Sequence, residues 1–156
     1  MDQDKSDNPG VIVPPPFFYG GVLVSGLVLN AFFPVPFLPS LLAFILGLPL
    51  IAVGILLARS AIQAMRRDNT SPDPYEPTTK IVVDGPFRFT RNPIYLSFTL
   101  MYLGITLAFN ALWALLLLLM VLLVIDRGVI LREERYLERK FGDEYLQYKA
   151  KVRRWI

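Results

Sequence analysis

The chain contains three long stretches without a charged side chain, and these constrain its fold more than any other feature. They run from Phe17 to Phe33, from Phe37 to Ala58 and from Pro93 to Ile125. As helices, the first two would be about 25 Å and about 33 Å long, close to the roughly 30 Å hydrocarbon core of a bilayer. Both stretches therefore predict membrane-spanning helices.

The third stretch is too long for one span, because a single helix over 93–125 would reach about 50 Å. Asn110 lies in its middle and suits a tight turn between two antiparallel helices. We therefore expect an all-α integral membrane protein with four transmembrane helices in two helical hairpins. The expected spans are about 17–33, 37–58, 94–109 and 111–127, in a single domain, 17–156, that follows an N-terminal tail, 1–16.

The distribution of charge predicts the orientation of these spans. All 16 Lys and Arg residues lie in the N-terminal tail, in the loop 59–92 or in the segment from Arg127 onward. Four spans place these segments on one side of the bilayer, and the positive-inside rule makes that side cytoplasmic. Both termini and the active site are therefore expected in the cytoplasm. Because the basic residues flank apolar spans, we expect membrane lipids as partners and no nucleic acid.

The chain has no Cys and no His. Disulfides, thiol nucleophiles and Cys metal sites are thereby excluded, as are the commonest general base and the commonest metal ligand. We expect no metal. Any chemistry must use carboxylates, amines, guanidinium groups, hydroxyls, amides, backbone groups or a bound cofactor.

The segment 84–95, with the sequence DGPFRFTRNPIY, is dense in features that suit a ligand site. Its Gly and Pro residues predict a turn, and Pro93 suits the first turn of a helix. Free N–H groups at that helix start favour an anionic or polar ligand group. A structured entry into the third span, with Arg88 and Arg91 on lipid phosphates, explains the same residues.

Two features beyond the fourth span are also open to two interpretations. The pair Glu133–Glu134 could hold a cation or belong to a solvated helix with ordinary ion pairs. After a break at Gly142, Asp143 could cap a short amphipathic helix with an aromatic face, within C-terminal helices that occupy 128–156. Such a helix suits the headgroup layer or a lid over a cofactor.

Taken in order, these features resemble a known family. The sequence GPFRFTRNPIY, an uncharged helical hairpin, a Glu pair and then FGDEYLQYKAKV are similar to the isoprenylcysteine carboxyl methyltransferase family, within a wider group that includes membrane phospholipid methyltransferases. The resemblance covers about Pro77 to Trp155. It implies that the cofactor is S-adenosyl-L-methionine, bound beside the membrane on the cytosolic side.

The resemblance also assigns cofactor-binding residues. The family's His-Pro-x-Tyr falls on 92–95, where Asn92 replaces the His and still offers a donor and an acceptor. The stretch that lines the adenosine falls on 79–82, a family aromatic falls on Phe87, and the acid that faces the cofactor falls on Glu133. A helix from Tyr145 to Val152 would close over the cofactor. The cofactor-binding set is then Thr79, Lys80, Ile81, Val82, Phe87, Asn92, Pro93, Ile94, Tyr95, Glu133, Tyr145 and Tyr148.

One position departs from the eukaryotic members, in which an Arg four residues before the acid is linked to the substrate carboxylate. Val129 occupies that position in this chain. Arg127 or Arg132 could replace the missing Arg. The implied catalytic set is therefore Glu133, Arg127 and Arg132.

The leading hypothesis is a membrane methyltransferase that transfers a methyl group to a lipophilic small-molecule or lipid-anchored acceptor. Carboxyl O-methylation of an isoprenylcysteine-like substrate is favoured, because a carboxylate is already deprotonated at pH 7 and needs no general base. A phospholipid N-methyltransferase is the alternative, and its amine would need a base such as Glu133 or Glu134. Two further alternatives are an NADPH-dependent enzyme resembling sterol reductases, with Arg88 and Arg91 on the phosphate, and a non-enzymatic scaffold.

Overall fold

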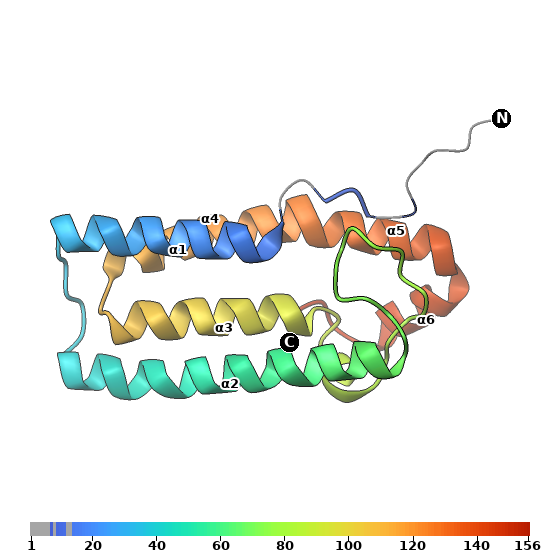
Figure 1. The fold of residues 1–156 in the computed structure, drawn as a ribbon, viewed down its shortest axis with the longest axis horizontal. Coiled ribbons are helices and arrows are strands. Elements are labelled where there is room, and N and C mark those ends of the chain that lie inside the picture. The colour runs from blue at the N-terminus through green and yellow to red at the C-terminus, as the bar shows by residue number, and fades with distance from the viewer. Residues whose placement is uncertain (1–6, 8, 12–13) are drawn as a thin grey trace.

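A computed structural model describes residues 7, 9–11 and 14–156 of the chain. The described residues form helices, turns and loops, and no strand occurs among them. Four apolar helices build a bundle, followed by a helical C-terminal region (Figure 1). The elements are α1 (Pro15–Phe32), α2 (Ser40–Arg67), η1 (Gly85–Arg88), α3 (Pro93–Ala108), α4 (Leu112–Ile125), η2 (Asp126–Ile130), α5 (Leu131–Phe141) and α6 (Asp143–Lys151).

Three helical segments are long and apolar enough to cross a membrane. They are Pro15–Phe32, Ser40–Arg67 and Leu112–Phe141, the last of which joins α4, η2 and α5 into one continuous helix. The remaining apolar helix, α3, is shorter, and at 1.5 Å per residue it reaches about 24 Å. Many large apolar side chains on α2 are exposed, among them Leu41, Ile45 and Leu56, as expected for a surface that faces lipid. Four complete spans remain a prediction.

The helices pair across the two hairpins. The most extensive helix contacts join α2 to α3 and α1 to α4, whereas α1 and α2, which a short turn connects, make no comparable contact (Figure 1). Small residues explain the first pairing. A Cβ atom built on Gly47 would lie 2.5 Å from the carbonyl oxygen of Gly104, so the two backbones touch. Close backbone approach at small residues is a general way in which helices associate within a bilayer.

Asn110 forms the turn between α3 and α4, as the sequence indicates. Its φ of 50° lies in the left-handed region, which Asn tolerates better than most residues. Its side chain also joins the two turns at this end of the bundle. The Oδ1 atom accepts hydrogen bonds from the backbone of Phe37 and Leu38 at 3.1 and 3.2 Å, and Nδ2 donates to the Leu38 carbonyl at 2.6 Å. The sequence pattern predicts the turn but not this link.

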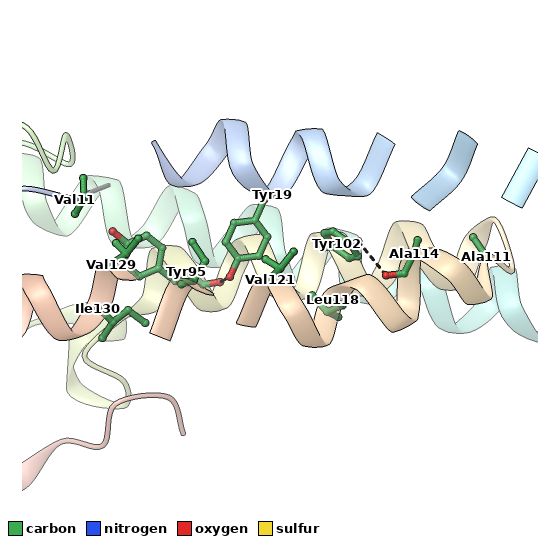
Figure 2. Close-up of a cluster of buried hydrophobic side chains, with 11 residues drawn as sticks. Val11, Tyr19, Tyr95, Tyr102, Ala111, Ala114, Leu118, Val121, Val129 and Ile130 are labelled. Carbon is green, nitrogen blue, oxygen red and sulfur yellow. Dashed lines mark hydrogen bonds between the residues drawn. The ribbon is translucent and has the colours of Figure 1, made fainter. Parts of the chain in front are cut away.

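Tyrosine side chains occupy the bundle core with their hydroxyl groups satisfied (Figure 2). The Tyr102 hydroxyl donates to the carbonyl oxygen of Ala114 at 3.0 Å, and the Tyr19 hydroxyl lies 2.9 Å from the Thr99 hydroxyl. Val121 and Ile125 of α4 are fully buried against them. A buried phenol stabilises such a core only when its O–H has a partner, and both have one.

The C-terminal region folds back toward the start of α3. One turn of π-helix, η2, leads from α4 into α5, and Gly142, with φ 54°, then reverses the chain into α6. The expectation that Asp143 caps this helix is wrong. Gly142 occupies the cap position, and Asp143 is the first helical residue without a side-chain cap hydrogen bond, because the positive φ of the reversal favours Gly there. The C-terminus ends beside the start of α3 (Figure 1).

Candidate functional site

A cavity of about 320 Å³ lies where α3 begins and α5 leaves the bundle. Its walls come from six parts of the chain: the N-terminal segment with the start of α1, the end of α2, the loop 70–82, the segment from Phe87 into the first turns of α3, the middle of α5, and α6. Most of the lining is apolar, with a few convergent polar groups. This combination is typical of small-molecule sites in proteins.

Most of the residues that the resemblance assigns to the cofactor line this cavity. They are Lys80, Ile81, Val82, Phe87, Asn92, Pro93, Ile94, Tyr95, Glu133, Tyr145 and Tyr148. Thr79 is not among the lining residues, because its hydroxyl donates to the Asn69 carbonyl at 2.8 Å. Arg127 and Arg132 do not line the cavity either. Arg127 is largely exposed beside Asp126, and Arg132 donates to the Gly10 carbonyl at 3.1 Å.

Tyr95 and Glu133 meet across the cavity wall, although they lie on different helices. The Tyr95 hydroxyl, from the first turn of α3, donates to Glu133 Oε1 at 2.5 Å. A phenol that donates to a carboxylate makes a short, charge-assisted hydrogen bond. This bond fixes the carboxylate at the cavity wall and joins two of the sequence motifs directly.

The loop 70–82 is ordered by a threonine pair, Thr70 and Thr79, of which the family resemblance names only Thr79. Thr70 is buried, and its hydroxyl lies 2.8 Å from the hydroxyl of Thr79 and accepts the Lys80 N–H at 3.2 Å. These bonds hold the backbone so that Ile81 and Val82 are buried along the cavity. Thr79 therefore supports the lining indirectly.

The last residues of the chain hold the segment before α3, and we call residues 153–155 the C-terminal clasp. The Arg154 carbonyl accepts hydrogen bonds from Thr90 Oγ1 at 3.1 Å and Asn92 Nδ2 at 2.9 Å, and the Arg153 carbonyl accepts the Arg91 N–H at 2.9 Å. One of the two amide N–H donors of Asn92 is thus already used within the protein. Asn92 occupies the His position of the family motif, but its hydrogen-bond partner, the Arg154 carbonyl, lies 62 residues later in the chain.

The side chains of the clasp reach two acids on the continuous helix. Arg154 donates to both oxygens of Glu134, from Nε at 3.0 Å and from Nη2 at 2.8 Å, and its Nη1 reaches Asp126 at 3.2 Å. The Trp155 indole donates to the same Asp126 oxygen at 3.2 Å. Glu134 is almost fully buried, so the second Glu of the pair belongs to an ion-pair network rather than to solvent. No sequence spacing predicts this arrangement.

Helix α6 covers one side of the cavity with two tyrosines. Tyr145 is 2% exposed, and the Tyr148 hydroxyl donates to the Phe87 carbonyl at 2.8 Å. Burial, followed by the Glu134 carboxylate, raises the pKa of Tyr145 to about 12, and burial also raises the pKa of Tyr148. Both phenols therefore stay protonated at neutral pH. The position of α6 matches that of a lid, which is one of the two interpretations of the sequence.

The N-terminal segment contributes another part of the wall. The Tyr136 hydroxyl lies 3.0 Å from an Asp7 carboxylate oxygen and accepts the Thr78 N–H at 3.2 Å, and Lys140 forms an ion pair with the same carboxylate. The hydrogen bonds from Lys140 and Tyr136 lower the pKa of Asp7. Pro9 is one of the lining residues, so a segment outside the family resemblance also forms part of the wall.

The comparisons with known proteins agree with this geometry. A model of the phospholipid methyltransferase family matches residues 42–144, which include the segment before α3 and the Glu pair. An uncharacterized protein of Haemophilus influenzae (strain Rd) is 51% identical over 63 residues, which are 40% of this chain and 100% of that protein. The matched region carries most of the cavity lining. The chain therefore belongs to the phospholipid methyltransferase family of membrane enzymes.

Proposed function

We propose that the chain is an S-adenosyl-L-methionine-dependent methyltransferase that acts on a lipophilic acceptor at the cytoplasmic face of the membrane. The proposal is carried by one observation: Tyr95, Glu133, Arg91 and residues 80–82 line the same cavity, and all of them lie in the region that matches the family. These residues are far apart in the sequence. A purely structural loop would not need to leave a hollow between them.

The residues present fit this cofactor. Ile81 and Val82 offer an apolar wall for an adenine ring, and Glu133 offers a carboxylate to a sulfonium or to ribose hydroxyls. The buried Nε of Arg91 donates no hydrogen bond among the described residues, which leaves a donor for a polar ligand atom. Arrangements of this kind, apolar walls with a few oriented polar groups, select ligands by orientation.

The bound cofactor would supply an activated methyl group, which is transferred by in-line displacement as the bond to sulfur breaks and the bond to the acceptor forms. The protein contributes orientation, which is worth several kcal/mol of such a barrier. The hydrogen bond from Tyr95 fixes Glu133, and α6 together with the N-terminal segment limits the access of water. No general base is required when the acceptor is a carboxylate.

The acceptor is expected to enter from the bilayer. Pro15 and Pro16 at the start of α1 and Ile94 and Phe98 of α3 all line the cavity, and α1 and α3 are in contact. A hydrocarbon chain suits such a wall, because each buried CH₂ contributes about 0.8 kcal/mol. Carboxyl O-methylation of an isoprenylcysteine-like acceptor remains our first choice, although Arg127 and Arg132 lie outside the cavity. Phospholipid N-methylation is the second candidate, and the description of the matched family favours it.

Calorimetric titration of the purified protein with S-adenosylhomocysteine tests the proposal. We expect binding by the wild type and a clear loss of affinity for Glu133→Gln, which keeps the size of the side chain and removes its charge. Glu76→Gln is the matched control, because Glu76 is exposed and does not line the cavity. No binding by the wild type, or equal binding by both variants, would count against the proposal.

Two further measurements separate the alternatives. Titration with NADPH tests the reductase hypothesis, which required Arg88 and Arg91 to act together; Arg88 is exposed and does not line the cavity. Binding of NADPH in preference to S-adenosylhomocysteine would favour a reductase, and binding of neither would favour a scaffold. Mass spectrometry of lipids incubated with the protein and labelled cofactor would then distinguish a methyl ester from a methylated amine.

A further inference from the structure

Arg91 brings an incompletely satisfied guanidinium group to the cavity wall. Its side chain is only 9% exposed, and it is one of the lining residues. The Nε and Nη1 atoms are buried and donate no hydrogen bond within the described part of the chain. Leaving a buried charged donor without an acceptor is costly, so such atoms beside a hollow indicate a missing partner.

The nearest acid compensates only part of this charge. Glu134 Oε1 lies 3.2 Å from Arg91 Nη1, but the same carboxylate also receives two hydrogen bonds from Arg154 and lies 3.8 Å from Lys149 Nζ. Arg154 also pairs with Asp126 at 3.2 Å and Lys149 with Glu138 at 2.5 Å, so each of these two cations has a further acid of its own. Glu133 is directed at Tyr95, and no ion pair joins it to Arg91 among the described residues. Among the described residues, Glu134 is therefore the only acid paired with Arg91, and the Nε atom of Arg91 has no hydrogen-bond acceptor.

The backbone of Arg91 is held in place before any ligand arrives. Its N–H donates to the Arg153 carbonyl at 2.9 Å, and its neighbours Thr90 and Asn92 both donate to the Arg154 carbonyl. A donor that is already positioned loses little freedom when a ligand binds. The C-terminal clasp thus fixes the backbone of Arg91 at the cavity wall.

We propose that Arg91 is the anion-binding residue of the cavity and that its Nε and Nη1 atoms bind a carboxylate of the ligand. The inference rests on the proposed function for the identity of that ligand. The carboxylate can come from the amino-acid end of the cofactor or from an acidic acceptor, and the chemistry at Arg91 is the same in both cases. Arginine suits a carboxylate because its donors are fixed in one plane.

Titration of the whole 156-residue chain in detergent distinguishes the two sources of the carboxylate. S-adenosylhomocysteine carries the carboxylate, whereas 5′-methylthioadenosine lacks the amino-acid end. If the cofactor supplies the anion, Arg91→Met binds S-adenosylhomocysteine about ten- to hundredfold more weakly and binds 5′-methylthioadenosine unchanged. The unchanged binding also shows that the variant is folded. Arg88→Met is the matched control and should match the wild type for both ligands.

If the acceptor supplies the anion, the variant binds S-adenosylhomocysteine normally and loses its preference for oleate over oleyl alcohol. An Arg91→Met variant that matches the wild type for all four probes would overturn the proposal.

A comparison on the wild type needs no variant, in case Arg91→Met does not fold. If the cofactor supplies the anion, the wild type should bind S-adenosylhomocysteine at least tenfold more tightly than its methyl ester; if the acceptor supplies it, the wild type should prefer oleate to oleyl alcohol. Absence of both preferences overturns the role of Arg91. A wild type that binds none of the adenosine ligands but prefers oleate refutes the proposed cofactor and retains the anion site.

Discussion

The side chain of Arg154 joins the end of the chain to two acids on the continuous helix, and its removal should destabilise the protein measurably. Arg154→Ala removes a two-point hydrogen bond to Glu134 and the contact with Asp126. Hydrogen bonds to charged groups contribute roughly 1.5–3 kcal/mol each, and breaking a buried pair on one side costs roughly 3–5 kcal/mol. Glu134 keeps Arg91 at 3.2 Å and is not left unpaired, so we expect a loss of about 2–3 kcal/mol, no more than the low end of the buried-pair range.

Thermal unfolding in detergent at a fixed scan rate measures this loss. For a chain of this size, about 2–3 kcal/mol corresponds to a midpoint that is lower by roughly 5–10 °C. Arg153→Ala is the matched control, because the Arg153 side chain is exposed and only its main-chain carbonyl binds Arg91; its effect should stay within about 0.5 kcal/mol. The unfolding midpoint of Arg154→Lys should lie between those of the two alanine variants, since Lys keeps the charge but lacks the planar set of donors that binds both oxygens of Glu134. Equal midpoints for Arg154→Ala and Arg153→Ala would refute the reasoning.

Two further predictions concern the bundle and its orientation. Gly104→Ala places a methyl group 2.7 Å from the Gly47 carbonyl oxygen and should cost roughly 1–3 kcal/mol, whereas Gly20→Ala, with open space around it, should cost much less; equal midpoints in the same unfolding assay would argue against tight α2–α3 packing. Because the chain has no Cys, single cysteines report topology. With a membrane-impermeant maleimide on intact cells, Val35→Cys should react and Glu76→Cys should react only after permeabilisation; the reverse pattern would place the loop on the outside.

The sequence by itself determines where the helices lie and where they turn. Uncharged stretches of membrane length predict α1 and α2, and the excess length of the third stretch predicts the turn at Asn110, which the structure contains. These features depend on local composition and length, which a pattern reports directly. The motifs that carry the resemblance lie around one cavity, so most of the lining residues can be grouped from the sequence before the structure is known.

Only the tertiary structure decides how these parts meet. The apolar spans have no polar face that would indicate their neighbours, so the pairing of α1 with α4 and of α2 with α3 follows from close contacts such as that of Gly47 with Gly104. The same holds for Arg154, whose partners lie 20 and 28 residues earlier. A sequence pattern records which side chains are available, whereas an ion pair between distant segments exists only after the backbone has brought them together.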